Sequence, residues 1–302
     1  MEEVSSIPKK KEESRFTMTE ILDGRKISQE IKSEVASGVK TLRLERGIVP
    51  RLHVLLIGNN PASEVYVKSK TKTAGELGIS SETTRLSETS SQEQVIAMID
   101  RLNDDGEVHG ILVQLPLPAH LHAEMILERI LPAKDVDGLH PLNLGLLAAG
   151  RPRFIPCTPY GVWELLKRTG HSPTGKQVVI LGRSNLVGRP LALLLSLKAP
   201  DCDATVTLCH SQTPDLAAIA GRADILISAI GKPEYVTSDM VKPGAVVIDV
   251  GIHRRSDGSL VGDVAFESVA PIASAITPVP GGIGPMTIAM LMQNTLQAAT
   301  ST

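Results

Sequence analysis

The sequence "VVILGRSNLVGRP" (residues 178–190) contains the clearest structural signal in the chain. Its apolar start predicts a buried strand, with Gly182 at the strand end and Gly188 at the start of the next helix. In dinucleotide-binding folds, glycines in this turn let backbone N–H groups approach a pyrophosphate. Ser184 stands where the usual motif has its second glycine. The motif therefore favours a nucleotide site, and a plain strand–turn–helix remains open.

The residues after the following strand indicate which nucleotide this turn would bind. Folds selective for NAD place an acidic residue there, where it binds the ribose hydroxyls. This chain has His210 and Ser211 after the strand "TVTLC" (205–209), and Arg183 lies in the first turn. Donors in place of an acid favour a ribose with a 2′-phosphate, so we predict NADP. Each residue taken singly also fits a capped turn with an exposed arginine.

Helix and strand patterns alternate on both sides of this turn. Apolar runs predict strands at residues 51–58, 108–115, 177–182, 205–209, 224–231 and 245–251. Helices are predicted by the apolar spacing from Ile27 to Leu42, and by start signals at Ser90 with Glu93, Thr158–Pro159 and Thr213–Pro214. Such alternation predicts parallel α/β sheets, and 302 residues suffice for two domains. We place the domain change near the helix at Thr158.

The composition excludes several classes of partner. Aromatic residues make up only 2% of the chain and the net charge is −2, so we expect no nucleic acid and no membrane partner. No run of about 18 apolar residues predicts a membrane span. Cys157, Cys202 and Cys209 are too scattered for disulfides or a metal site, so we expect no metal and a reducing, cytoplasmic location. Residues 1–17, expected to be a mobile extension, leave a mitochondrial location open.

The segment "SEVYVKSKTK" (63–72) places three lysines at alternate positions. On a helix that turns about 100° per residue, Lys68 and Lys72 share a solvated face. Lys70 falls on the opposite, apolar side, one turn from Tyr66. Such a lysine can snorkel to water over an apolar surface, or it can be functional if polar partners converge on it.

Two later segments supply polar partners for this lysine. "VQLPLP" puts Gln114 at the carboxyl end of an apolar strand, and "KDVDGL" supplies Asp135 and Asp137 in a loop. Both aspartates also fit ordinary turn caps before a glycine, and Tyr66 also fits a core position. The residues alone leave these alternatives open.

Seven segments, in this order, resemble the bifunctional methylenetetrahydrofolate dehydrogenase/methenyltetrahydrofolate cyclohydrolase family: "YVKSK", "VQLPLP", "KDVDGL", "FIPCTP", "GRSNLVGRP", "PGAVVIDVGI" and "ITPVPGGIGPMTIAMLMQNT". The resemblance runs from about Met18 to the C-terminus. It implies a two-domain α/β fold with a cleft between a folate-binding catalytic domain and a Rossmann NADP-binding domain. The catalytic domain would comprise residues 18–160 and 284–302, and the Rossmann domain residues 161–283. A homodimer through the Rossmann domain is also implied.

The resemblance implies roles for individual residues. Lys70 would be the essential catalytic group and Gln114 would position it, while Tyr66 would stack on the folate ring and Asp137 would bind the pterin's amino edge. Further folate contacts are implied at Ser63, Val113, Leu115, Pro278, Pro280, Gly281, Gly282, Ile283 and Gly284. NADP contacts are implied at Gly182, Arg183, Ser184, Gly188, His210, Ser211 and Ile252.

The implied activity is oxidation of 5,10-methylenetetrahydrofolate with NADP, then hydrolysis of the methenyl product to 10-formyltetrahydrofolate in one-carbon metabolism. Hydride transfer needs alignment more than a base, whereas hydrolysis needs proton transfer. A free lysine, with a pKa of about 10.4, is too basic for this at pH 7. An apolar face and a cationic substrate both lower that pKa, and an uncharged Gln114 would not restore the ammonium. We therefore expect Lys70 to serve the cyclohydrolase step.

Three other functions remain open from the sequence. A dehydrogenase without hydrolase activity is opposed by Lys70 and Gln114. A nucleotide-binding module without catalysis is the second. A hydrolase that uses Cys157 or Cys209 with a histidine is the third, and no orienting group at a telling spacing supports it. We expect Cys157 to line the cleft or to pack beneath it.

Overall fold

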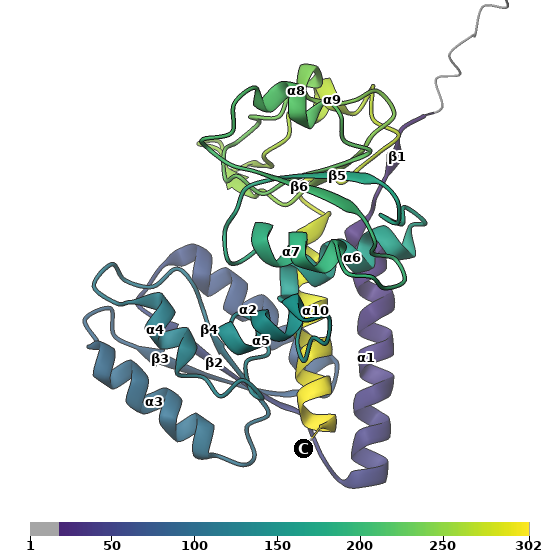
Figure 1. Ribbon diagram of the computed structural model, residues 1–302. Helices are drawn as coiled ribbons and strands as arrows, with labels where there is room; N and C mark the ends of the chain where they lie inside the picture. The colour runs from purple at the N-terminus through teal and green to yellow at the C-terminus, as the bar shows by residue number, and fades with distance from the viewer. Residues whose placement is uncertain (1–17, 302) are drawn as a thin grey trace, which may run out of the picture.

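In the computed structural model, which describes residues 18–301, long helices join two parallel sheets (Figure 1). The smaller sheet has the order β3-β2-β4 and consists of β2 (Arg51–Ile57), β3 (Ser80–Leu86) and β4 (Gly110–Val113). The larger sheet has the order β1-β11-β8-β7-β5-β6 and consists of β1 (Glu20–Ile21), β5 (Gln177–Leu181), β6 (Thr205–Cys209), β7 (Ile225–Ser228), β8 (Val246–Asp249) and β11 (Ala275–Ile276). All neighbouring strands in both sheets are parallel, which confirms the predicted α/β class.

The helices connect and cover these sheets. They are α1 (Gly24–Arg46), α2 (Pro61–Glu76), α3 (Gln92–Asp104), α4 (Ala123–Glu128), α5 (Pro141–Ala148), α6 (Cys157–Arg168), α7 (Gly188–Leu195), α8 (Leu216–Ala220), the 3-10 helix η1 (Ser238–Met240), α9 (Phe266–Val269) and α10 (Ile283–Thr300). A short antiparallel hairpin of β9 (His253–Arg254) and β10 (Leu260–Val261) follows β8. Within the described residues, no helix is long and apolar enough to cross a membrane.

The strand β3 was missed by the sequence reasoning. Its sequence, "SSETTRL", contains one large apolar residue, because it lies at the edge of its sheet and most of its side chains are partly or fully exposed. It nevertheless pairs with β2 over its whole length, from Arg51 opposite Ser80 to Ile57 opposite Leu86. The buried neighbour β2 carries the apolar signal for this pair.

The predicted start of α3 was wrong by one residue. Ser91, and not Ser90, is the N-cap, and it forms the capping box with Gln94 rather than with Glu93. Consecutive serines followed by alternating Gln and Glu fit two registers equally well. Ser90 is instead buried, and its backbone N–H donates to Ser87 O at 3.0 Å.

Two other predicted helix starts were also wrong. Thr158 lies inside α6, whose N-cap is Pro156, so its hydroxyl is free for another contact. Thr213 does not begin α8, which starts at Leu216; its hydroxyl accepts the backbone N–H of His210 at 2.9 Å.

Alternate residues of the central strands belong to two different cores. Val178 and Ile180 of β5 pack in the core that contains buried residues of α1, α6, α7 and α10, together with residues of β2. Val179 and Leu181 pack on the opposite face, against residues from α8, η1 and α9. Because both faces are covered, β5 is apolar from Val178 to Leu181. The first core is shared by the two sheets and fixes them relative to one another.

The helix α10 is the main element of this shared core. It lies beside α1 and α6 (Figure 1), and residues such as Met286, Met290 and Leu291 are almost fully buried. The division into a catalytic domain of residues 18–160 with 284–302 and a Rossmann domain of residues 161–283 stays a prediction. In the structure, β1 belongs to the first of these ranges but pairs with β11 in the larger sheet. Residues 1–17, predicted to be an extension, lie outside the described residues.

Candidate functional site

Lys70 lies on α2 with its amine held by Gln114. Its Nζ donates to Gln114 Oε1 at 2.9 Å, and Gln114 Nε2 donates to Leu115 O at 2.7 Å. The second bond fixes the amide so that its oxygen faces the lysine. Asn60 begins α2 by accepting the N–H groups of Ala62 and Ser63, which sets the helix that carries the amine.

Burial controls the charge of this amine. Burial lowers the pKa of Lys70, and the nearby Asp137 and Cys157 oppose part of that shift. An uncharged Gln114 partner adds no electrostatic support for the ammonium. The site thus holds a primary amine that gives up its proton more readily than a lysine in water does.

Two adjoining cavities surround this amine. The larger, of about 380 Å³, and the smaller, of about 140 Å³, are both lined by Lys70, Gln114, Leu115, Thr158 and Thr287. The larger cavity is also lined by Val187, Val250 and Ile252, which follow strands of the larger sheet. The cleft therefore has walls from both sheets, as a reaction between two bound molecules requires.

The structure brings most of the predicted folate residues to this cleft. The cavities are lined by Ser63, Tyr66, Lys70, Val113, Gln114, Leu115, Asp137, Ile283 and Gly284. The Tyr66 side chain is in the larger cavity, and the residue is 39% exposed, so the core alternative for Tyr66 was wrong. Asp137 faces the smaller cavity, beside Cys157.

Four predicted residues form a turn and do not line the two cavities. Pro278, Pro280, Gly281 and Gly282 precede α10, and Gly282 N donates to Pro278 O at 2.8 Å. Arg25 N donates to Gly281 O at 3.1 Å, which ties the turn to the start of α1. Gly281 has φ 115°, a conformation that favours glycine. This turn supports the cavity wall formed by Ile283 and Gly284.

Asp135 has a structural position that differs from that of Asp137. It is buried, and its carboxylate accepts the N–H of His140 at 2.8 Å and the Asn143 Nδ2 donor at 2.8 Å. Burial raises the pKa of Asp135, while these donors oppose the rise. The turn-cap alternative is thus confirmed for Asp135.

The cysteines do not form an activated nucleophile. Cys157 lies under the cleft, its Sγ is 3.4 Å from Val136 O, and burial raises its pKa well above the usual value. Burial also raises the pKa of Cys209. Because the thiolate is the reactive form, these shifts argue against the cysteine hydrolase alternative. The expectation that Cys157 packs in or beneath the cleft is confirmed.

A third cavity, of about 270 Å³, lies at the carboxyl ends of β5, β6 and β7. Of the predicted cofactor residues, it is lined by Gly182, Arg183, Ser184, His210 and Ser211. Ile252 faces the Lys70 cleft instead.

The glycines of this turn are required by close packing. Gly182 has φ 112°, and a Cβ there would lie 2.2 Å from Ala229 O. A Cβ on Gly188 would lie 1.9 Å from Gly182 O, so Gly188 packs against the turn and does not line the cavity. Ser184 Oγ accepts Val187 N at 3.1 Å, so Ser184 stabilises the turn with its side chain.

Several lining residues were missed by the sequence reasoning. Thr158 Oγ1 and Thr287 Oγ1 are 3.1 Å apart in the wall beside Lys70, although 129 residues separate them in the chain. Lys232 and Tyr235 line the 270 Å³ cavity, with Lys232 Nζ 5.1 Å from the ring centre of Tyr235. Lys232 and Tyr235 follow the carboxyl end of β7, where ligands bind in parallel sheets, so their place in the sequence could have predicted them.

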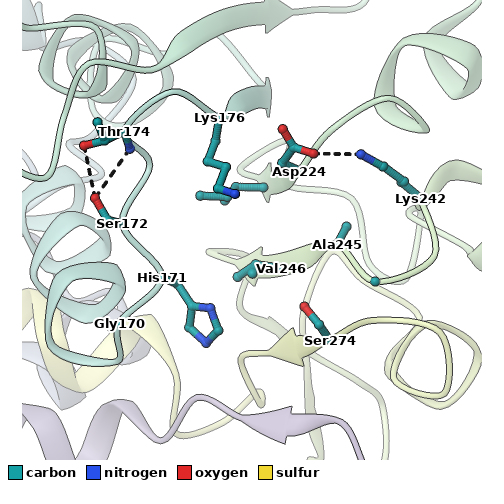
Figure 2. A pocket seen from close by; sticks show the side chains of 12 residues that line it. Gly170, His171, Ser172, Thr174, Lys176, Asp224, Lys242, Ala245, Val246 and Ser274 are labelled. Carbon is teal, nitrogen blue, oxygen red and sulfur yellow. Dashed lines mark hydrogen bonds and ion pairs between the residues drawn. The ribbon is translucent and has the colours of Figure 1, made fainter. Parts of the chain in front are cut away.

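A further cavity, of about 490 Å³, lies at the opposite end of the larger sheet (Figure 2). His171, Lys176, Asp224, Lys242 and Ser274 are among its lining residues. Lys242 Nζ is paired with Asp224 at 2.7 Å, as Figure 2 shows, so this carboxylate neutralises one of the two lysines. Ligands of open α/β sheets bind at the carboxyl ends of the strands, and this cavity lies at the amino ends. It is not the candidate active site.

Comparisons with known proteins cover almost the whole chain. Residues 22–137 match the family model described as tetrahydrofolate dehydrogenase/cyclohydrolase, catalytic domain, and residues 156–302 match the NAD(P)-binding domain of the same family. "Bifunctional protein FolD 1" of Myxococcus xanthus is 56% identical over 292 residues, covering 94% of this chain and 99% of the relative. "Bifunctional protein FolD" of Streptococcus agalactiae is 53% identical over 282 residues, covering 93% and 98%.

Two crystal structures have the same fold along both chains. The bifunctional FolD methylenetetrahydrofolate dehydrogenase/cyclohydrolase of Campylobacter jejuni superposes with a TM-score of 0.90 at 49% identity, covering 94% of this chain and 99% of that chain. The Trypanosoma brucei FolD enzyme, complexed with NADP cofactor and an inhibitor, superposes with a TM-score of 0.88 at 39% identity, covering 94% and 98%.

Proposed function

Because the chain belongs to the tetrahydrofolate dehydrogenase/cyclohydrolase family, we propose that the cleft around Lys70 is where it carries out both reactions of that family. The protein oxidises 5,10-methylenetetrahydrofolate to 5,10-methenyltetrahydrofolate with NADP, and it hydrolyses the product to 10-formyltetrahydrofolate. The observation that carries the site assignment is the amine of Lys70, held by an uncharged amide in a cleft with walls from both sheets.

The amine of Lys70 would act in the hydrolytic step. Water must add to the methenyl carbon and a C–N bond must then break, so a proton has to move. The lowered pKa of Lys70 favours the neutral amine, which can accept a proton from water and return it to the leaving nitrogen. Gln114 would keep the amine in place during both transfers, since its amide is itself fixed by Leu115 O.

The folate ring would lie along the wall formed by α2. The partly exposed ring of Tyr66 offers a face for stacking, and Asp137 offers a carboxylate for the pterin's amino edge. Ser63 Oγ is buried in this wall and, among the described residues, has no hydrogen-bond partner. A buried hydroxyl without a partner is costly, so we assign it a polar group of the folate.

The residues of the third cavity fit NADP. When bound, NADP accepts the hydride from the one-carbon bridge. Gly182, Arg183 and Ser184 all line this cavity, and the lack of a side chain at Gly182 favours close approach of the backbone to a pyrophosphate. Arg183 and Ser211 would bind the 2′-phosphate, with His210 beside them. Ile252 would hold the nicotinamide end toward the folate cleft.

Assembly and location form a separate part of the proposal. We infer a homodimer through the larger sheet, as the family resemblance implies; in the described chain, β6 is an edge strand of that sheet. A molar mass near twice 32.2 kDa in light scattering would support the dimer, and a mass of one chain would overturn it. All three cysteines are free and buried, which supports a reducing, cytoplasmic location.

A matched pair of lysine variants tests the site assignment. Lys70→Met should abolish cyclohydrolase activity, whereas Lys68→Met, on the exposed face of the same helix, should leave it unchanged. Hydrolysis is followed by loss of methenyltetrahydrofolate absorbance, and folding by circular dichroism. Near-normal hydrolysis by a folded Lys70→Met variant would refute the assignment.

A further inference from the structure

We propose that Asp263 is a positioning residue for NADP, because its buried carboxylate shapes the loop after β7 that forms one wall of the cofactor cavity. The inference rests on the proposed location of NADP and adds a residue that does not itself line that cavity. Asp263 is fully buried, at 0% exposure, and follows the hairpin of β9 and β10.

The Asp263 carboxylate accepts five hydrogen bonds. The acceptor Oδ2 takes the backbone N–H groups of Ile230 at 2.8 Å and Gly231 at 3.3 Å, and the hydroxyl of Ser228 at 3.2 Å. The acceptor Oδ1 takes the N–H of Lys232 at 3.0 Å. His253 Nε2 lies 2.8 Å from the same Oδ1, and a carboxylate can only accept, so Nε2 carries the proton.

Three of these donors form a concave anion-binding turn. Successive backbone N–H groups converge where one residue adopts a left-handed conformation, and Gly231 does so with φ 70°. Such turns commonly bind an external anion. Here an internal carboxylate occupies the turn, so residues 230–232 are held in one shape before any cofactor arrives.

A second carboxylate holds Asp263 in place. Asp249, at the end of β8, accepts Gly251 N at 2.9 Å, Asp263 N at 2.9 Å and Val264 N at 2.8 Å. A Cβ on Gly262 would lie 1.9 Å from Asp249 Oδ2. Glycine is therefore required beside Asp249, and the two aspartates link the end of β8 to the loop after β7.

This link connects two walls of the cofactor site. Ile230 and Lys232 line the 270 Å³ cavity. Ile252, next to His253, lines the cleft that contains Lys70. Loss of the Asp263 carboxylate would leave the loop amides without their acceptor, and the loop would no longer be fixed for NADP. All five bonds of Asp263 end within residues 228–253, so the Lys70–Gln114 pair should be unaffected.

Measuring NADP affinity and hydrolysis in the same variant distinguishes a positioning role of Asp263 from a general loss of stability. We expect Asp263→Asn, which puts an NH₂ group against N–H donors, to raise the Kd for NADP at least tenfold in titration calorimetry without folate. Hydrolysis of methenyltetrahydrofolate without NADP should stay within twofold of the parent enzyme. An unchanged Kd, or an equal loss of NADP affinity and hydrolysis, would overturn the proposal.

The histidine supplies a second test that does not depend on the folding of Asp263→Asn. His253→Leu removes one donor to Asp263 and should raise the KM for NADP several-fold, while His253→Gln keeps a donor at similar reach and should restore it. Equal KM values for the two variants would count against the proposal. If the parent chain binds NADP in calorimetry but turns over no folate, the proposed function fails while this inference is still tested by the Kd values.

Discussion

The most informative single change is Gln114→Glu, which alters charge at the Lys70 amine with almost no change of shape. Gln114 Oε1 is 2.9 Å from Lys70 Nζ. Two full charges at that separation attract by about 6 kcal/mol at an effective dielectric constant of about 20. One pKa unit corresponds to about 1.36 kcal/mol, so the gross effect is a rise of roughly 4 units in the lysine pKa.

Burial of the new carboxylate offsets part of this attraction, because a buried ion pair loses hydration. If half remains, the lysine pKa rises by about 2 units, and at any pH below the parental pKa the neutral amine falls about 100-fold. We therefore expect cyclohydrolase activity on the acid side of the parental pH profile to fall about 100-fold, and to recover at alkaline pH.

The assay is the pH profile of methenyltetrahydrofolate hydrolysis, corrected for the uncatalysed rate at each pH. In Gln114→Glu, the acid limb of the kcat/KM profile should shift to higher pH by about 2 pH units. The control Gln114→Met has a side chain of similar length but no charge, so it should lower activity without shifting the acid limb to higher pH. An acid limb at its parental position in Gln114→Glu would refute the role of Lys70 as the titrating group.

Three other predictions follow from the same structure. Arg183→Ala should weaken binding of NADP by about 1.5–3 kcal/mol, roughly 10- to 150-fold in KM, and should barely change the KM for NAD. The control is Arg189→Ala on α7, and equal effects of Arg183→Ala on both cofactors would remove the 2′-phosphate argument. Gly188→Ala should destabilise the protein by about 1–3 kcal/mol in urea unfolding, because its Cβ would meet Gly182 O; an unchanged midpoint would show that the turn can relax. Because burial lowers the pKa of Lys70, the unfolded chain binds more protons between the folded pKa and the usual value near 10.5, so stability should rise with pH across that window. The difference in unfolding free energy between the parent protein and Lys70→Met should show this rise, and a pH-independent difference would contradict it.

The strands that the sequence predicts best are those buried on both faces. In β5, β7 and β8 every position except Gln177 is buried, so apolar runs mark them, ending in Ser228 in β7 and Asp249 in β8. The predicted ends extend too far where the chain enters a cavity. The run 108–115 includes Gln114, but β4 ends at Val113, and Gln114 beyond it turns its side chain to Lys70.

Helical periodicity was enough to set Lys70 apart from Lys68 and Lys72, because the two faces of α2 differ in exposure. Contacts between distant segments could not be read in this way. The hydroxyls of Thr158 and Thr287 meet only because α6 and α10 pack together. The sequence analysis did not single out Asp263, because its five donors come from the end of β7, the loop after β7 and β9, which only the folded chain brings near it.

The place of α10 in the chain has a consequence for biosynthesis. Ile283, Gly284 and Thr287 form part of the cleft wall, and they are made after both sheets. A nascent chain that has not yet released residues 283–300 from the ribosome lacks one side of the cleft and the α10 part of the core that joins the two sheets. We expect a chain interrupted before residue 283 to leave exposed the apolar core residues that α10 covers, and to lack a complete cleft.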